Sequence, residues 1–142
     1  MVDNINFFFE DVEFDFSNEE KVKQWVGDTV AQYDFSVDEI NYIFCSDEYL
    51  YQINVEYLNH DTYTDIITFD NSEREGEILS DIFISVERVK DNASEFNVSF
   101  EDELHRVMIH GILHLVGLKD KTDDEKSIMR STEKKHLDLR SF

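Results

Sequence analysis

Hydrophobic residues recur along the chain in two patterns, the alternation of β-strands and the three-to-four-residue spacing of α-helices. Ile40, Tyr42 and Phe44 repeat at every second position and predict a strand with one buried face. Val22 and Trp25 repeat at helical spacing and predict a buried helix face, with Trp25 as a core anchor. In chain order, the patterns predict a strand or bent strand pair over 5–16, a helix over 17–33, a strand over 39–46, a helix over 47–57, strands over 65–70 and 77–85, and helices over 86–96, 100–116 and 122–139.

Polar residues at the predicted helix starts support these boundaries. Ser99 and Thr122 are good N-cap residues, because a hydroxyl can accept a hydrogen bond from a free amide of the first turn. Asp102 stands three residues after Ser99, where a capping box usually has glutamate. Asp47 is a candidate cap for the second helix. The order of elements, without proline, repeat or linker, predicts an α+β fold in which residues 1–142 form one compact domain, a mixed sheet of about four strands packed with about five helices.

Candidate metal chemistry lies at the end of the predicted helix 100–116. His110 and His114 are one helical turn apart, so both imidazoles leave the same face. Gly117 can end the helix in a left-handed turn, and Asp120 can then approach the two histidines. Two imidazole nitrogens and one carboxylate oxygen, with an open fourth position, make a ligand set typical of catalytic zinc. If Asp120 is not the third ligand, the neighbouring acids are the next candidates (Asp123 and Asp124).

Other interpretations of this motif stay open. Paired histidines can be satisfied core residues without a metal, although the glycine and the acid that follow favour a metal site. A carboxylate in place of an imidazole favours harder ions, so manganese or nickel are alternatives to zinc. The metalloprotease form of the motif has glutamate after the first histidine, as general base. Gly111 stands there, which disfavours peptide hydrolysis by the usual route.

The run from His110 to Gly117 resembles the signature of the YbeY family, metal-dependent endoribonucleases of ribosomal RNA maturation, whose usual text is H-G-x-L-H-L-x-G-Y-D-H. Residues 53–57, 64–69 and 79–85 are similar to further family stretches, in family order. The resemblance therefore covers about residues 50–140. It implies the same α+β architecture, with the metal helix at its centre.

The resemblance also implies the function and the site. It implies a zinc-dependent, single-strand endoribonuclease that acts in ribosomal RNA maturation and ribosome quality control, with ribosomal RNA, a ribosomal subunit and ribosome-associated proteins as partners. His110 and His114 match the first two zinc ligands of the family. Two departures stand out: Asp120 occupies the position of the third ligand histidine, and Leu58 occupies that of an arginine implicated in activity.

Residues outside the ligand set carry further hypotheses. Asp65 and Asp81 are expected at strand starts within the family-like segments and are candidates for proton transfer; the alternative is a structural role, bonding backbone amides. His60 and His136 are expected at the surface. His105 is five residues before His110, about 140° around the helix, and cannot share the metal face.

The net charge of −20 is unusual for a protein that handles RNA. Residues 119–142 hold seven basic and six acidic residues, a net charge of +1, whereas the remaining 118 residues hold six basic and 27 acidic ones, a net charge of −21. The least acidic face is therefore expected beside the metal motif, and intrinsic RNA affinity is expected to be weak. The acidic surface and the missing arginine at Leu58 favour one alternative, a non-catalytic, metal-stabilised module that docks on the ribosome or a protein partner. Another metallohydrolase is a second alternative.

The remaining composition predicts the compartment. No apolar run is long enough for a transmembrane helix, and the acidic start is unlike a secretory signal, so we expect a cytoplasmic protein without a membrane partner. The single cysteine, Cys45, cannot form an internal disulfide and lies in a predicted buried strand. Met129 is expected to pack in the core.

Overall fold

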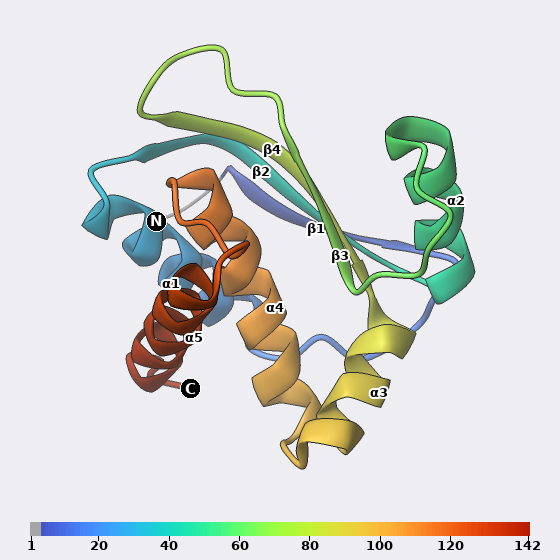
Figure 1. The fold of residues 1–142 in the computed structure, drawn as a ribbon. Helices are drawn as coiled ribbons and strands as arrows, with labels where there is room; N and C mark the ends of the chain where they lie inside the picture. The colour runs from blue at the N-terminus through green and yellow to red at the C-terminus, as the bar shows by residue number, and fades with distance from the viewer. Residues whose placement is uncertain (1–3) are drawn as a thin grey trace.

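The structure, a computed structural model, describes residues 4–142 (Figure 1). These residues form five helices and four strands, in agreement with the predicted order. The elements are β1 (Ile5–Glu10), α1 (Glu19–Gln32), β2 (Ser36–Cys45), α2 (Asp47–Leu58), β3 (Ile66–Asp70), β4 (Glu77–Ser85), α3 (Val86–Phe96), α4 (Phe100–Leu115) and α5 (Asp123–Asp138). The predicted α+β class is therefore confirmed.

The four strands form one mixed sheet with the order β1-β2-β4-β3. β2 pairs in parallel with β1 and with β4, whereas β3 pairs with β4 in the antiparallel sense. The parallel pairs require crossovers, which α1 and the long segment containing α2 and β3 provide. β3 thus forms one edge of the sheet, and this edge faces the end of α4 that carries the paired histidines.

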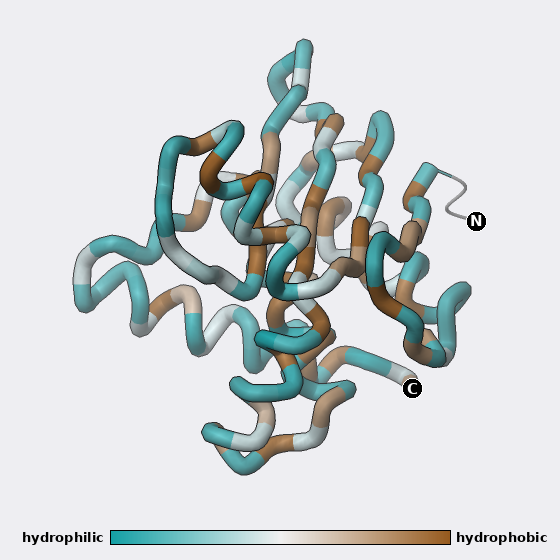
Figure 2. Tube along the Cα trace, turned by 90° about the vertical axis from the view of Figure 1, so that its right-hand side faces the viewer, coloured by the Kyte–Doolittle hydropathy of each residue, from teal (hydrophilic) through white to brown (hydrophobic). Residues whose placement is uncertain are grey.

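The two faces of the sheet are covered differently. α1, α3, α4 and α5 bury the main core against one face, where Tyr42, Phe44 and Ile82 of the strands are fully buried. α2 packs on the opposite face through a smaller cluster that includes Leu50 and Ile67. Figure 2 shows the hydrophobic stretches gathered in the interior of the trace and the hydrophilic ones in the outer segments. Within the described residues, no helix is long and apolar enough to cross a membrane.

α4 runs through the centre of the main core. Most of its residues are buried, and Tyr42 of β2 donates its hydroxyl hydrogen to the Met108 carbonyl. Gly111 faces the sheet at close range: a β-carbon there would lie 3.1 Å from both Ile66 Cδ1 and Thr68 Oγ1 of β3. A side chain would therefore separate the helix from the strand, and the glycine after the first histidine keeps the two elements together.

Several predicted boundaries were wrong. β1 ends at Glu10, because Asp11 takes a left-handed conformation (φ 58°) that turns the chain, and residues 12–16 cross the core edge without strand pairing. β2 begins at Ser36 rather than at residue 39. The cap of α2 is Ser46, which accepts a hydrogen bond from the Tyr49 amide.

Two polar residues near the helix ends also differ from expectation. Asp102 does not complete a capping box, because its carboxylate accepts a hydrogen bond from Arg140 instead. His136 was predicted at the surface but is fully buried: its Nε2 lies 2.9 Å from the Tyr33 hydroxyl, and its backbone carbonyl accepts a hydrogen bond from Trp25. Thr122 does form the predicted cap, with a complete capping box to Glu125.

Candidate metal centre

The paired histidines lie on the last two turns of α4, and the turn that follows brings the acid to them. Gly117 has the expected positive φ (111°), and its amide donates to the His114 carbonyl. The Leu118 amide donates to the Leu113 carbonyl, which closes the helix end. The chain then runs back beside the helix before Thr122 caps α5, and Asp120 lies in this short connection.

Three donor atoms converge there. His110 Nε2 and His114 Nε2 are 3.0 Å apart, and Asp120 Oδ2 lies 3.4 Å from the first and 3.3 Å from the second. Nitrogen and oxygen ligands at about 2.0–2.1 Å from a tetrahedral zinc ion stand about 3.3 Å from one another. The donors therefore fit a divalent ion of this size, and the predicted ligand set of two histidines and one aspartate lies together.

The contacts of Nδ1 in each histidine ring show that Nε2 is the nitrogen free to bind a metal ion. His114 Nδ1 lies 3.1 Å from the Leu118 carbonyl, which can only accept, so Nδ1 carries the hydrogen. His110 Nδ1 lies 2.5 Å from Glu133 Oε2 and donates to it in the same way. In the neutral rings both Nε2 atoms then present lone pairs to each other and to the carboxylate. A shared metal ion satisfies all three atoms at once.

Glu133 belongs to a buried ionic network. It comes from α5 and is 2% exposed; its Oε1 accepts a hydrogen bond from Arg106 Nη1 at 3.1 Å. Arg106 also binds Glu103 through two hydrogen bonds, of 2.7 and 2.9 Å. Burial alone would raise the pKa of Glu133, but the hydrogen bond from His110 and the charge of Arg106 outweigh it and hold this pKa below the usual value. The acid is therefore an ionised acceptor for His110.

A pocket of about 500 Å³ opens over the three donors, between α4 and the edge strand β3. Thr64, Asp65, Thr68 and Asp70 line its strand side. Asp65 immediately precedes β3, as predicted, and its carboxylate accepts a hydrogen bond from Asn92 at 3.3 Å. Among the lining residues within 4–142 there is no lysine or arginine, so a bound cation would provide the positive charge of this pocket.

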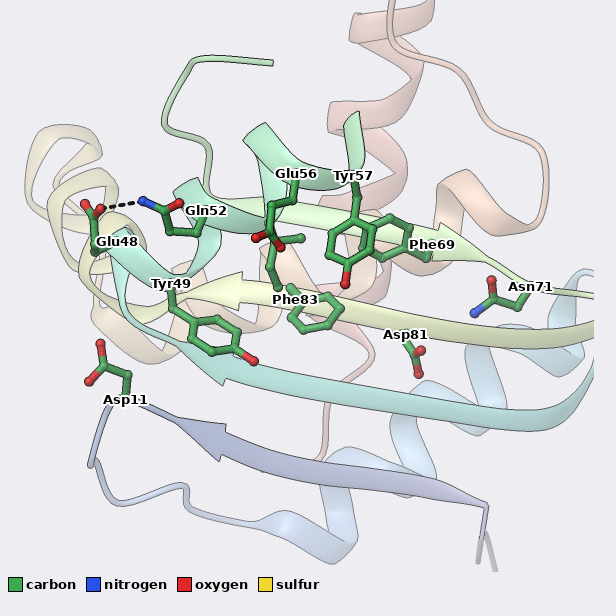
Figure 3. Close-up of a pocket in the computed structure, with 11 residues that line it drawn as sticks. Asp11, Glu48, Tyr49, Gln52, Glu56, Tyr57, Phe69, Asn71, Asp81 and Phe83 are labelled. Carbon is green, nitrogen blue, oxygen red and sulfur yellow. Dashed lines mark hydrogen bonds between the residues drawn. The ribbon is translucent and has the colours of Figure 1, made fainter. Parts of the chain in front are cut away.

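Asp81 has a different location. It lies in the middle of β4 rather than at a strand start, and the alternation of the strand turns it away from Ile82, which faces Gly111 of α4. It lines a separate pocket of about 590 Å³ on the opposite face of the sheet (Figure 3). Tyr57 and Phe83 are among the aromatic residues of that pocket. The two candidates for proton transfer are thus separated by the sheet, and only Asp65 shares the pocket of the donors.

The other histidines and acids lie outside the donor cluster. His60 is exposed, as predicted, and lines a shallow pocket beyond β3. His105 points away from the donors, as predicted, and its Nδ1 lies 2.7 Å from Arg140. Asp123 and Asp124 are exposed in the first turn of α5 and lie outside the group of three donor residues.

Glu133 and Arg106 are the residues of the site that sequence reasoning missed. Both are charged residues in predicted helices, where a charge usually indicates an exposed position. Glu133 lies 23 residues after His110, and no local spacing connects the two. The available signal was weak: Glu133 follows the buried Met129 by four residues, at the spacing of the same helix face.

Comparison with known proteins identifies the family of this chain. The family described as Endoribonuclease YbeY matches residues 4–140, nearly the whole chain. The chain belongs to the YbeY family. An Endoribonuclease YbeY of Cytophaga hutchinsonii is 51% identical over 140 residues, covering 99% of this chain and 98% of the relative. One of Flavobacterium johnsoniae is 57% identical over 129 residues and covers 91% of each chain.

A solved structure supports the family fold. The solution structure of TM1509 from Thermotoga maritima matches 93% of this YbeY chain and 87% of its own length, with a TM-score of 0.61 and 28% sequence identity. The resemblance inferred from the sequence motif is therefore confirmed, and it extends beyond residues 50–140 to the segment that starts at residue 4.

Proposed function

We propose that this YbeY protein is a metal-dependent endoribonuclease that cleaves single-stranded RNA in ribosomal RNA maturation and ribosome quality control, in the cytoplasm, with zinc as the ion. The observation that carries the proposal is the convergence of His110 Nε2, His114 Nε2 and Asp120 Oδ2 within 3.4 Å at the floor of an open pocket. Three protein ligands and an open position are typical of catalytic rather than structural zinc. The relatives named Endoribonuclease YbeY support RNA as the substrate.

The chain contributes binding, orientation and proton transfer. A bound divalent ion would supply Lewis acidity, which polarises a phosphoryl oxygen and lowers the pKa of a water molecule towards neutral pH. His110, His114 and Asp120 would hold the ion. Asp65 lines the same pocket and is the acceptor for the proton that the attacking water loses. Asp81 is excluded from this role in the proposal, because the sheet stands between it and the donors.

The pocket and the charge distribution favour a single strand delivered by a partner. The volume of about 500 Å³ is on the order of one nucleotide, and single strands expose the bases and phosphates that a recessed site can hold. A net charge of −20 opposes long-range attraction of RNA. A ribosomal subunit or a ribosome-associated protein that presents the RNA would supply the affinity that this surface lacks.

The acidic surface favours one other function, a docking module in which the metal is structural. In that case the loss of a ligand would affect stability but not an RNA-cleaving activity. The two functions therefore differ in one measurable property, the dependence of cleavage on the three ligands.

The test measures metal content and RNA cleavage in parallel. We would compare wild type with His114→Ala and Asp120→Ala, and with Asp123→Ala as the matched control, since Asp123 is exposed three residues from Asp120. We expect about one zinc per wild-type and control protein, cleavage of a single-stranded ribosomal RNA fragment by both, and loss of zinc and cleavage in the two ligand variants. Zinc with no cleavage in wild type would favour the docking module. Absence of any bound metal after reconstitution with zinc, manganese or nickel would refute the metal-dependent reaction.

A further inference from the structure

Glu133 contacts the metal centre but is not one of its three donor residues. It lies on the side of His110 opposite the converging donor atoms, and it contacts Nδ1 rather than Nε2. A carboxylate that is 2% exposed is costly unless its oxygens are paired. Both are: Oε2 with His110 and Oε1 with Arg106. A carboxylate engaged at both oxygens has a defined orientation.

We propose that Glu133 and Arg106 are positioning residues of the metal centre. Glu133 fixes the hydrogen of His110 on Nδ1, which leaves the lone pair on Nε2 aimed at Asp120 and His114. Arg106 fixes Glu133, because its guanidinium is itself held by the two hydrogen bonds that it donates to Glu103 on the same helix. The importance of this pair for catalysis rests on the proposed function, whereas the effect on the His110 ring exists without metal.

The two histidines are held unequally. His110 donates to a carboxylate, and His114 donates to the neutral carbonyl of Leu118. Hydrogen bonds to an ionised acceptor are roughly twice as strong as neutral ones, so His110 is the more firmly oriented and more electron-rich ligand. The removal of Glu133 should therefore change the tautomer of His110 and leave that of His114 as it is.

Arg106 extends the effect to the wall of the pocket. Its Nη2 lies 3.9 Å from Asp65 Oδ2, so one guanidinium faces the acid that orients His110 and also the proposed proton acceptor. The side chain of Arg106 is 17% exposed, and its planar fork reaches Glu103 and Glu133 at the same time. Lysine carries the charge without this fork. Arg106→Lys should therefore loosen the network without removing its charge.

The experiment uses the full chain and Zn²⁺ alone as the probe. Glu133→Gln and Glu133→Ala are compared with Asp138→Asn, a matched change at an exposed acid of the same helix. Ring ¹⁵N spectra of the metal-free protein report the tautomer of each histidine, and competition with a chelator measures zinc affinity. We expect zinc affinity to fall about tenfold in Glu133→Gln and about a hundredfold in Glu133→Ala. We also expect the Nδ1–H form of His110 to lose its dominance in both, whereas His114 keeps its Nδ1–H form because the Leu118 carbonyl still accepts from it.

Three results would overturn the proposal: an unchanged His110 tautomer in Glu133→Gln, unchanged zinc affinity in a folded Glu133→Ala, or an equal loss in Asp138→Asn. If Glu133→Ala fails to fold, Arg106→Lys still tests the proposal through zinc affinity. We expect its zinc affinity to lie between those of wild type and Glu133→Ala, with a melting temperature similar to that of wild type. Failure of the proposed function is distinguishable, because a protein that binds zinc without cleaving RNA still gives the tautomer and affinity results.

Discussion

His105 makes the stability of the fold sensitive to acid. It is 4% exposed, and its Nδ1 lies 2.7 Å from an Arg140 nitrogen, so the neutral ring accepts a hydrogen bond. Burial and the adjacent Arg140 charge lower the pKa of His105 from 6.5 to about 4. A histidine with a lowered pKa stabilises the fold above its unfolded pKa, and this stabilisation is lost as the pH falls through 6.5 towards 4.

The size of the effect follows from the two pKa values. The unfolded pKa is 6.5 and the folded pKa is about 4. Proton linkage therefore lowers the free energy of unfolding by about 2 kcal/mol between pH 7.5 and pH 5, and by about 3 kcal/mol once the pH is below both pKa values. With a urea m-value of about 1–3 kcal/mol/M, the unfolding midpoint shifts by roughly 1 M between pH 7.5 and pH 5.

The assay compares urea unfolding of metal-free wild type and His105→Gln at both pH values. Glutamine keeps an acceptor for Arg140 but does not titrate, so the difference in unfolding free energy between the two proteins should shrink by about 2 kcal/mol on going to pH 5. Other histidines titrate equally in both proteins and cancel. A difference that stays the same at the two pH values would refute the attribution to His105.

Three other perturbations test the packing around the site. Gly111→Ala places a methyl group against Ile66 and Thr68 at 3.1 Å; overpacking of about 1–3 kcal/mol exceeds the gain of about 1 kcal/mol in helix propensity, so calorimetry should show a lower melting temperature, and an increase would contradict the close approach. Burial raises the pKa of the Cys45 thiol to about 12, so a thiol reagent should label it only on unfolding; labelling of the native protein would show that the strand opens. Thr122→Ala removes the cap of α5 and should cost about 1 kcal/mol by urea unfolding, and a neutral result would mean that the capping box adds nothing.

The metal ligands were predictable because they depend on local geometry. His110 and His114 share a helix face by spacing alone, and a glycine that ends a helix brings the next residues back alongside it. The proximity of Asp120 to the two histidines could therefore be predicted without knowledge of any tertiary contact. The fold class was predictable for a similar reason, since the spacing of hydrophobic residues indicated helix or strand for each element.

The residues that failed prediction depend on which distant element packs where. The alternation in β4 separates Asp81 from Ile82, but the sequence does not say which of the two faces α4 covers. Glu133 and His136 lie on a helix with many charged residues, and only its packing against α1 and α4 makes them buried. Burial of a polar residue is a property of the assembled layers, and hydropathy indicates solvent for such positions.

The separation of the two large pockets by a single sheet has a consequence for how the molecule can be occupied. One pocket opens beside α4 on the edge of β3, and the other lies beneath α2 on the far face. Two ligands could bind at once without steric competition, and neither would cover the other. The strand that lines both pockets is β3, where Thr68 lines the pocket of the donors and its neighbour Phe69 lines the pocket on the far face. Substitutions of lining residues outside β3 can therefore be combined and interpreted independently.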